Sequence, residues 1–556
     1  MKKNSLIILC AMLIAAIPVS SQVTMGAKKA PEKFSLLELI SNSRRGLRLP
    51  QLTTQERTAL EHSTDFQNQK TGLAKGLVIF NTDTKCMQVW NGTVWISECA
   101  SQTNVCFETS TKGTDFWVSF GNNFNSANVL LALKISAEES TDVTLNFTHD
   151  GSTTTYPVGN NSLITIDLSS VKDLGDKRNA VYLSSTAAGT YDNSLHITSV
   201  KPVSVYAFNT SVATSDATGV LPADAWGNDY YRLSYAAFSG FFDFEMIIAN
   251  QDNTNIFLNS IPIATLNKGQ TYVNTLASGD MTGRHITSDK PVAYFTHSTI
   301  TKIPMGRDYG DILFEQMMPV NRWGNRFLVP NAPEGANDKN NHIRIIASEA
   351  GTTVNYWGAA SFDVTGGQSG FTSGSKLNAG QWVELEISGS NNVACYISAD
   401  KPVGVAAYMV GSNNTENPNG DPSIAWIPPL NQSIQSSIIA PFMFPFGVQN
   451  DQTNFDGLYS GSNKQGNVSH YMIIIAPTDK KDQTVVNGTA IPSAGWIDNQ
   501  ESGYSYYYWY FDNVADLNNI FKIANSDGVI VLCGGVTQVE SYYYNAGSGT
   551  CIINND

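Results

Sequence analysis

The feature that most constrains this chain is a stretch of sequence that recurs three times: a turn, Lys-Pro-Val and a continuous apolar run. The copies are ITSVKPVSVYAFNTS at 197–211, ITSDKPVAYFTHSTI at 286–300 and ISADKPVGVAAYMVG at 397–411. A fourth, degenerate copy occupies 523–536, where Gly528 replaces the proline. Proline has no N–H for a sheet ladder, and at the first residue of a strand none is needed. Each Lys-Pro-Val therefore predicts the start of a strand.

A second recurrent piece precedes each copy and consists of two strand-like runs around a polar turn. An apolar run, a polar turn of about five to eight residues and a second run predict a β-hairpin. These pieces occupy residues 129–147, 244–259, 343–358 and 471–488.

Together the two pieces predict an all-β fold of four tandem β-sandwich-like units, with a closed, propeller-like arrangement of the units as the alternative. The spacing of roughly 90 to 130 residues is too long for the usual short solenoid and propeller repeats. The low share of charged residues, 15%, also favours strands and turns over surface helices. The units are expected at residues 111–219, 220–316, 317–423 and 424–556.

A proline followed four residues later by Trp-Gly-Asn occurs twice, in LPADAWGND and MPVNRWGNR. The proline stiffens the chain, the tryptophan buries its ring, and glycine permits a positive-φ turn before the next strand. We therefore predict structural joints between units, with the tryptophans as buried plugs and not ligand contacts. The joint residues are Pro222, Trp226, Gly227, Pro319, Trp323 and Gly324.

The first residues, MKKNSLIILCAMLIAAIPVSSQ, have the pattern of a secretory signal peptide. Two lysines precede an apolar run, and small residues precede Gln22. We predict a signal peptide at 1–21, a polar linker at 22–33, and a secreted or cell-surface protein exported by a Gram-negative bacterium. No later segment is apolar enough to be a transmembrane helix. The 48 acidic and 34 basic residues also disfavour nucleic acid as a partner.

A small module is predicted at 34–110. Thr53 or Thr54 can cap a short helix that runs through Leu60. In CMQVWNGTVWISEC the Asn-Gly pair predicts a hairpin turn, which brings Cys86 and Cys99 together across two strands. In an oxidising compartment we expect these two cysteines to form a disulfide. The remaining pairings stay open, and the absence of Cys-x-x-Cys disfavours zinc.

This module resembles a short N-terminal module of exported Bacteroidota proteins and tail-fibre-like proteins. The resemblance rests on RGLRLPQLTTQER, GLVIFNTDTKC and WNGTVW. It implies display or self-association and no chemistry.

The remainder resembles the N-terminal domain of the IgG Fc-binding protein family, which also occurs in exported bacterial proteins. The resemblance covers about 111–551 and rests on TKGTDFWVSF, SDKPVAYFTHS, EQMMPVNRWGNRFLVP and GVLPADAWGNDYY. It implies a binding protein without catalytic residues or cofactors. The human domain has cysteines shortly after its Pro-Val-Ala strand, whereas THSTITKIPMGRD in this chain has none.

Catalytic and metal-binding patterns do not stand out in the sequence. The seven histidines form no HExxH motif and are expected on surfaces or in turns, and no Gly-x-Ser-x-Gly elbow is present. We therefore predict no enzyme, no metal and no cofactor. A glycoside hydrolase is kept as a third candidate, because the distance between two carboxylates is not visible in a sequence.

The aromatic run GYSYYYWYFDN at 503–513 is the one candidate binding surface in the sequence. In a strand its side chains alternate, so aromatic rings cover both faces. Packing between units is one interpretation, and a ligand platform is the other. The platform residues are Tyr506, Tyr507, Tyr508, Trp509 and Tyr510.

The sequence thus predicts an exported, non-catalytic adhesion protein that recognises a host or environmental glycoprotein or mucin through a β-rich surface. The alternative is a structural component of an extracellular fibre or oligomer.

Overall fold

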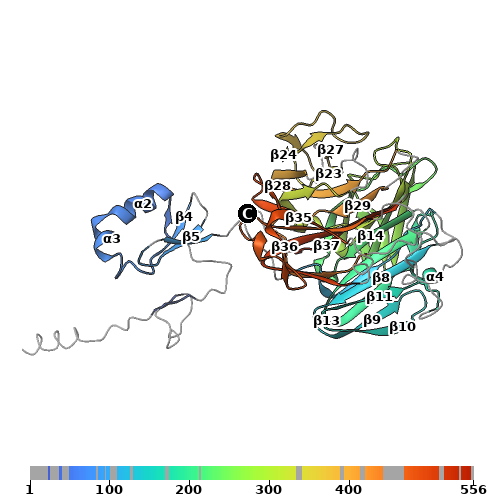
Figure 1. The fold of residues 1–556 in the computed structure, drawn as a ribbon, viewed down its shortest axis with the longest axis horizontal. Helices are drawn as coiled ribbons and strands as arrows, with labels where there is room; N and C mark the ends of the chain where they lie inside the picture. The colour runs from blue at the N-terminus through green and yellow to red at the C-terminus, as the bar shows by residue number, and fades with distance from the viewer. Residues whose placement is uncertain are drawn as a thin grey trace, which may run out of the picture. The chain divides into compact units, whose positions relative to one another are not determined.

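A computed structural model describes most of the chain, and it divides into two compact parts, Met1–Thr103 and Asn104–Asp556 (Figure 1). The signal peptide predicted at 1–21 lies outside the described residues. The described residues are 23–25, 37–39, 49–82, 86–93, 95–99, 109–124, 129–169, 175–211, 214–333, 341–388, 393–413, 420–441, 469–511, 519–537 and 540–551.

The N-terminal part contains a four-stranded sheet in the order β3-β4-β5-β6 and two short helices. The predicted helix is confirmed: Thr53 Oγ1 accepts the N–H of Glu56, and the Glu56 carboxylate accepts the N–H of Thr53 at 2.8 Å. This reciprocal capping satisfies N–H groups that a helix start leaves free. The elements are β1 Val23–Met25, β2 Leu37–Leu39, β3 Gln51–Leu52, α2 Thr54–His62, α3 Thr64–Gln69, β4 Val78–Asn81, β5 Cys86–Trp90 and β6 Trp95–Cys99.

The hairpin predicted from Asn91-Gly92 is present, but its strands end at Trp90 and resume at Trp95, so the loop is longer than two residues. In this register Cys86 lies opposite Cys99. The disulfide between them stays a prediction, because only the backbone of this pair is described.

The C-terminal part is built from four units, each around one long strand of 16 or 17 residues. Lys-Pro-Val lies in the middle of three of these strands, so the prediction that it starts a strand is wrong. The reason is a bulge in the long strand at this point: the long strand advances by five residues while the first strand of the unit advances by two, and the proline within this bulge needs no ladder bond. The long strands are β13 Leu195–Ser211, β20 His285–Thr301, β28 Ala394–Met409 and β36 Phe521–Thr537.

The four copies occupy equivalent places, as tandem repeats require. Val203 lies opposite Gly113, Val292 opposite Gly227 and Val403 opposite Gly324, in each case on the first strand of the same unit. In the fourth unit Val529 lies opposite Ile434 after the same kind of shift. The prediction of four β pseudo-repeats is therefore confirmed.

The other strands complete each unit (Figure 1). The first unit has β7 Gly113–Val118, β8 Leu130–Ala137, β9 Thr141–Phe147, β10 Thr153–Val158, β11 Ser162–Asp167, α4 Arg178–Val181 and β14 Thr214–Val220. Strand β12 Gly189–Tyr191 follows α4 in the chain but joins the sheet of the second unit, where it pairs with residues 271–273. The second has β15 Gly227–Tyr231, β16 Phe242–Ala249, β17 Thr254–Leu258, β18 Ile261–Leu266, β19 Thr271–Ala277 and β21 Asp311–Gln316. The third has β22 Gly324–Pro330, β23 His342–Ala347, β24 Thr352–Trp357, β25 Ala359–Ser361, β26 Ser375–Leu377, β27 Trp382–Ile387 and β29 Ser423–Trp426. The fourth has β30 Ile434–Ile439, β31 Ser469–Pro477, β32 Val485–Val486, β33 Thr489–Ala490, β34 Ile497–Asn499, β35 Tyr504–Tyr510 and β37 Glu540–Gly547.

The predicted hairpins are arches instead. Strands β8 and β9 do not pair with each other; β8 pairs with the second half of β13 and β9 with its first half. The same holds for β16 and β17 on β20, for β23 and β24 on β28, and for β31 and β32 on β36. The turn between them therefore crosses from one sheet layer to the other, a geometry that strand periodicity does not distinguish from a hairpin.

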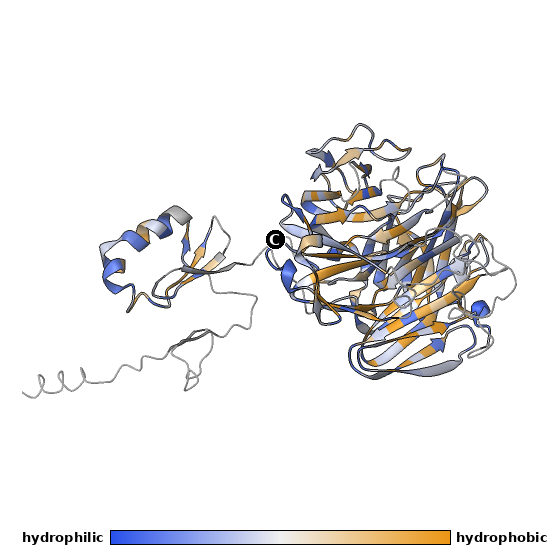
Figure 2. Cartoon of the chain, in the orientation of Figure 1, coloured by the Kyte–Doolittle hydropathy of each residue, from blue (hydrophilic) through white to orange (hydrophobic). Residues whose placement is uncertain are grey.

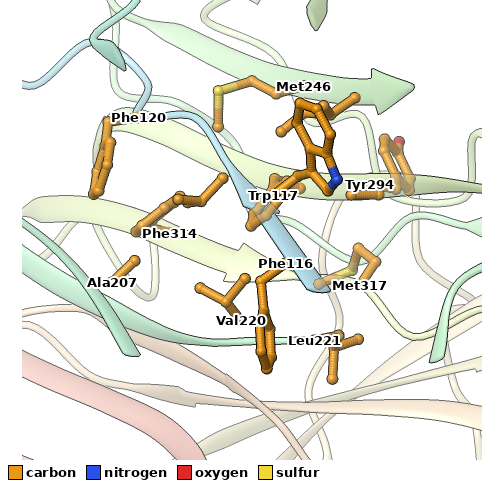
Figure 3. Close-up of a cluster of buried hydrophobic side chains, with 14 of the residues drawn as sticks. Phe116, Trp117, Phe120, Ala207, Val220, Leu221, Met246, Tyr294, Phe314 and Met317 are labelled. Atoms are coloured by element: carbon orange, nitrogen blue, oxygen red, sulfur yellow. The ribbon is translucent and has the colours of Figure 1, made fainter. Parts of the chain in front are cut away.

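The hydrophobic cores are continuous between units. Figure 3 shows Phe116 and Trp117 of β7 in one cluster with Met246, Tyr294 and Phe314 of the second unit. Further clusters join the third unit to the fourth and the fourth to the first. Figure 2 shows apolar residues concentrated on these strands, whereas α2 and α3 of the N-terminal part are largely hydrophilic.

The four units form a closed ring, as the alternative arrangement predicted. The last strands of the units pack in a cycle, in which β14 and β29 each contact both β21 and β37. The beginning and end of the ring also pair, since Thr111 donates to Ser548 O at 2.9 Å and Thr550 donates to Thr109 O at 3.1 Å.

Asp216 marks the centre of this cycle. One carboxylate oxygen accepts the N–H groups of Ala217 and Tyr543, and the other accepts those of Phe314 and Ile424. One donor therefore comes from the last strand of each unit. Burial raises the pKa of Asp216 well above its ordinary value, although these donors act in the opposite direction.

The two joints have the same structure. Trp226 Nε1 donates to Leu221 O at 3.2 Å, and Trp323 Nε1 donates to Met318 O at 2.9 Å. Both rings are buried in the cluster shared by the first three units. Pro222 and Pro319 precede the short 3-10 helices η2 Ala223–Ala225 and η3 Val320–Arg322.

The reason given above for the joint glycines is wrong, because neither Gly227 nor Gly324 has a positive φ. Gly227 is needed for close packing instead. A Cβ there would lie 2.5 Å from Cβ of Pro319, and one at Gly113 would lie 2.3 Å from Cβ of Pro222. The starts of the first and second units thus lie directly against the joint that follows each of them.

Candidate functional site

A polar cavity of about 330 Å³ lies where the second unit meets the third, and we call it the junction pocket. Loops from both units form it: the turn after β17 and the segment before β20 from the second unit, and the segments on either side of β26 from the third. Its lining residues are Asn259, Thr282, Gly283, Arg284, Gly366, Gly367, Gln368, Gly380, Gln381 and Trp382.

Four glycines line the pocket, and close packing between the units and within the third unit leaves little space for side chains there. Gly283 has a φ of +91°, and a Cβ there would lie 3.0 Å from Gly380 O. A Cβ at Gly367 would lie 3.1 Å from the ring of Trp382. Backbone and the edge of Trp382 therefore shape the cavity, while the amide side chains of Asn259, Gln368 and Gln381 remain exposed around it.

Arg284 is the charged side chain of the pocket wall. One of its terminal nitrogens lies 3.0 Å from Glu245 Oε1, and Glu245 is fully buried. The same carboxylate also accepts hydrogen bonds from Asn274 and Tyr294, each at 2.8 Å. The Nε of Arg284 is buried and has no acceptor among the described residues. The positive charge of Arg284 is thus already compensated by the buried carboxylate of Glu245.

Arg344 ties the third unit to the second beneath the pocket. It reaches from β23 and donates to Glu384 at 2.8 Å, to Asp280 at 2.7 Å and to Ser234 O at 2.7 Å. Its guanidinium lies 4.2 Å from the centre of the Trp382 ring, on which it stacks. Trp382, which lines the pocket, is therefore held in place by a buried ion network.

The pKa shifts in this network follow from pairing. Burial alone would raise the pKa of Glu384, but the charge of Arg344 and hydrogen bonds from His342 and Arg344 lower it. Burial also opposes ionisation of Asp280, and the charge of Arg344 again lowers its pKa. For Asp243, burial dominates and raises the pKa to about 7, although Arg232 acts against it. Glu384 and Asp280 are therefore ionised at neutral pH.

A second cavity, of about 420 Å³, belongs to the first unit. Its charged wall residues are engaged with each other, since Arg178 donates to both oxygens of Asp176. Tyr182 and Tyr191 also have hydrogen-bonded hydroxyls, to Asn122 at 2.9 Å and to Ala187 O at 2.8 Å. We rank the junction pocket first because two units build it and exposed amide groups surround it.

The predicted aromatic platform lies on β35, which pairs with β31 and β34. Its two faces pack differently: Tyr506 and Tyr508 contact the cluster shared by the third and fourth units, and Tyr507 and Trp509 contact the cluster shared by the fourth and first. Tyr510 is 41% exposed. The Tyr508 hydroxyl donates to Asn331 O at 2.7 Å, a bond between units. The structure does not bring these residues into either cavity described above.

The expectation that the histidines lie on surfaces or in turns is wrong for three of them. His297, His342 and His470 are buried on β20, β23 and β31. His196 and His285 are partly buried, occupy equivalent positions and pair with Asp115 at 3.1 Å and Asp229 at 2.8 Å. The burial of His297, His342 and His470 is not visible in the local sequence, because a small polar residue precedes each of them.

In the described part of the chain, no three His, Cys, Asp or Glu side chains are arranged to hold a metal ion. Cys395 and Cys533 are free thiols buried in the core. None of the helices among the described residues is long and apolar enough to cross a membrane.

Sequence reasoning missed the junction pocket, although the signal was present. The sequences SLHITSVKPV at 194–203 and GRHITSDKPV at 283–292 differ at three positions, and at the first two of them Gly283 and Arg284 replace Ser194 and Leu195. Both substituted residues line the pocket. A difference between otherwise matching repeats was the available clue.

Two family models match this chain. The model described as IgGFc binding protein matches residues 216–533, from β14 to β36 and more than half of the chain. The model described as phage tail like trimerisation region matches residues 24–115. No curated protein and no solved structure matches. The two resemblances seen in the sequence are therefore confirmed, the larger one over a shorter range than 111–551.

Proposed function

Because the chain belongs to the IgGFc binding protein family, we propose that it is an exported, non-catalytic adhesion protein that recognises a glycoprotein or mucin-type partner. The observation that carries this proposal is the junction pocket, a polar cavity with exposed amide side chains and a compensated charge. Concave sites with a few convergent polar groups are the usual binding sites of proteins.

We also propose that the N-terminal part gathers several copies of the chain. The match to a phage tail like trimerisation region supports this role and favours a trimer. Three copies of the chain held together would raise the avidity for a repetitive partner such as a mucin. A purely structural fibre component is the alternative, in which self-association remains and ligand binding is absent.

Export is part of the same proposal. Residues 1–21 act as the signal peptide, and the mature protein is secreted or held at the cell surface. In that oxidising compartment Cys86 and Cys99, which lie opposite each other, form a disulfide.

The test is an array of mucins, other glycoproteins and antibody Fc fragments, probed with the chain purified without residues 1–21. Gln368→Trp should abolish binding, because this exposed side chain lines the pocket and a larger one would fill it. Gln251→Trp, at an exposed position outside the pocket, should leave binding unchanged. If no glycoprotein on the array is bound, or if Gln368→Trp binds normally, the proposal is wrong.

A further inference from the structure

The junction pocket presents no uncompensated charge to a ligand. Arg284 is paired with the fully buried Glu245 at 3.0 Å. Beneath the floor, Arg344 is paired with both Asp280 and Glu384. An anionic ligand would therefore compete with buried carboxylates for these guanidinium groups and gain little from them.

The pocket instead offers uncharged hydrogen-bonding groups. Asn259, Gln368 and Gln381 each carry an exposed amide, which both donates and accepts. The orientation of Gln381 is fixed, because its Oε1 accepts the N–H of Asn378 at 2.8 Å. Among the described residues nothing accepts a hydrogen bond from its Nε2, which is thus available to a ligand. Amide groups of this kind match the hydroxyl groups of a sugar.

The size of the pocket limits the ligand. A volume of about 330 Å³ lies at the lower end of the range of about 300 to 1,000 Å³ for small-molecule sites. Trp382 lines the pocket and, being 4% exposed, presents a small apolar edge to a ring. One sugar residue fits this space better than an extended chain.

We propose that the junction pocket binds a single uncharged sugar residue, a hexose or an N-acetylhexosamine, in preference to sialic or uronic acids. This inference rests on the proposed function and names its ligand class. Gln381 donates to a sugar hydroxyl, Gln368 contributes a second hydrogen bond, and Trp382 contacts the ring.

The test uses the chain without residues 1–21 and ligand-observed NMR titration. The probes are methyl galactoside, methyl N-acetylglucosaminide, N-acetylneuraminic acid and glucuronic acid. At least one neutral probe should bind, with an affinity that is unchanged between about 0.05 M and 0.5 M salt, and both acids should bind at least tenfold more weakly.

Variants locate the site. Gln381→Ala and Gln368→Ala should each lower the affinity for the neutral probe at least fivefold, whereas the control Gln251→Ala should leave this affinity unchanged. Circular dichroism checks that every variant is folded. The inference is overturned if an acid binds more tightly than both neutral probes, if no probe binds, or if both Gln381→Ala and Gln368→Ala bind the neutral probe normally.

The two proposals fail in different ways. If the chain still binds a glycoprotein on the array while none of the sugars binds or competes, the sugar inference is wrong and the proposed function stands. If the chain binds no glycoprotein on the array either, both the sugar inference and the proposed function are wrong.

Discussion

Two junctions between units of the ring contain the same kind of loop, but only the second of these two junctions contains the junction pocket. Asn267-Lys268-Gly269-Gln270 packs the second unit against the first, and Asn378-Ala379-Gly380-Gln381 packs the third against the second. In both loops the glutamine Oε1 accepts the asparagine N–H, at 2.9 and 2.8 Å, and the glycine has a positive φ. The loops are therefore not what differs between the junctions.

The difference lies in the surface that each loop meets. At the first junction Ser194 donates to Gly269 O at 2.6 Å and Gln270 donates to Asp192 at 3.1 Å, so the contact is filled. At the second junction Gly283 takes the place of Ser194, and Gln381 has no such partner in the described structure. The cavity thus occurs at the junction where the receiving unit has Gly283 and Arg284 in place of Ser194 and Leu195.

The largest expected effect comes from the buried ion network of the second junction. Arg344→Ala removes the guanidinium that pairs with the buried carboxylates of Asp280 and Glu384 and should lower the free energy of unfolding by about 3–5 kcal/mol. Chemical denaturation measures this loss. The control Lys401→Ala breaks an exposed pair with Glu349 and should cost at most about 1 kcal/mol. Equal losses in the two variants would mean that the network does not stabilise the junction.

Acid should weaken the first junction. His297 is buried and its Nε2 contacts Asn122 O of the first unit at 2.8 Å. Burial lowers its pKa to about 4, below the unfolded value near 6.5, so the fold favours the neutral ring. Its contribution is present above pH 6.5 and is lost as the pH falls towards 4, at a cost of roughly 3 kcal/mol.

His297→Gln keeps a donor for Asn122 and should remove this part of the pH dependence. The measurement is the free energy of unfolding at several pH values between 4 and 7. Burial also lowers the pKa of His470, to about 3, so some acid sensitivity should remain in the variant. An unchanged pH profile would show that His297 is not the titrating group.

Substitution by alanine should destabilise the fold equally at the glycines of the two junctions but should affect sugar binding at only one of them. Gly269→Ala meets Thr148 at 2.7 Å and Gly283→Ala meets Gly380 O at 3.0 Å, and both sites have a positive φ. Each should cost about 1–2 kcal/mol. Only Gly283→Ala should also weaken binding of the neutral sugar, as measured by NMR titration.

Gly240→Ala is the matched control for these glycine variants. It has a φ of +88° with no neighbour within 4 Å, so it reports the backbone cost alone. If Gly269→Ala also reduced sugar binding, the assignment of the ligand to the second junction would be wrong.

The smallest effect should separate the two glutamines. Both Gln270→Ala and Gln381→Ala lose the hydrogen bond within the loop. Gln270→Ala also loses the hydrogen bond to Asp192, which has no counterpart at Gln381 in the described structure. The first variant should therefore be less stable than the second by about 0.5 kcal/mol, because the bond is exposed. Thermal unfolding of the two variants side by side measures this difference, and the reverse order would contradict the comparison.

The predictions that succeeded from sequence were the local ones. The cap at Thr53, the hairpin that places Cys86 opposite Cys99, and the four equivalent long strands all follow from residue type and spacing over short distances. Such features depend on backbone donors and side chains within a few residues of each other. The joints with their buried Trp226 and Trp323 were found in the same way, although their glycines serve packing.

The predictions that failed concerned partners that are distant in the chain. Whether β8 pairs with β9 or arches over to another layer depends on β13, about 60 residues later. The burial of His297 likewise depends on Gly121 of the first unit, where a Cβ would lie 2.5 Å from the imidazole ring. Periodicity describes one strand at a time and contains no information on these neighbours.

The sequence by itself determined that this chain makes four copies of one β unit, because Lys-Pro-Val and the apolar runs act through local backbone chemistry. Only the tertiary structure decided that the ring closes, that Asp216 accepts an N–H from every unit, and that Gly283 and Arg284 open a pocket at one junction. Closure and cavity both depend on how the surfaces of neighbouring units fit, and that fit is a property of packing in three dimensions.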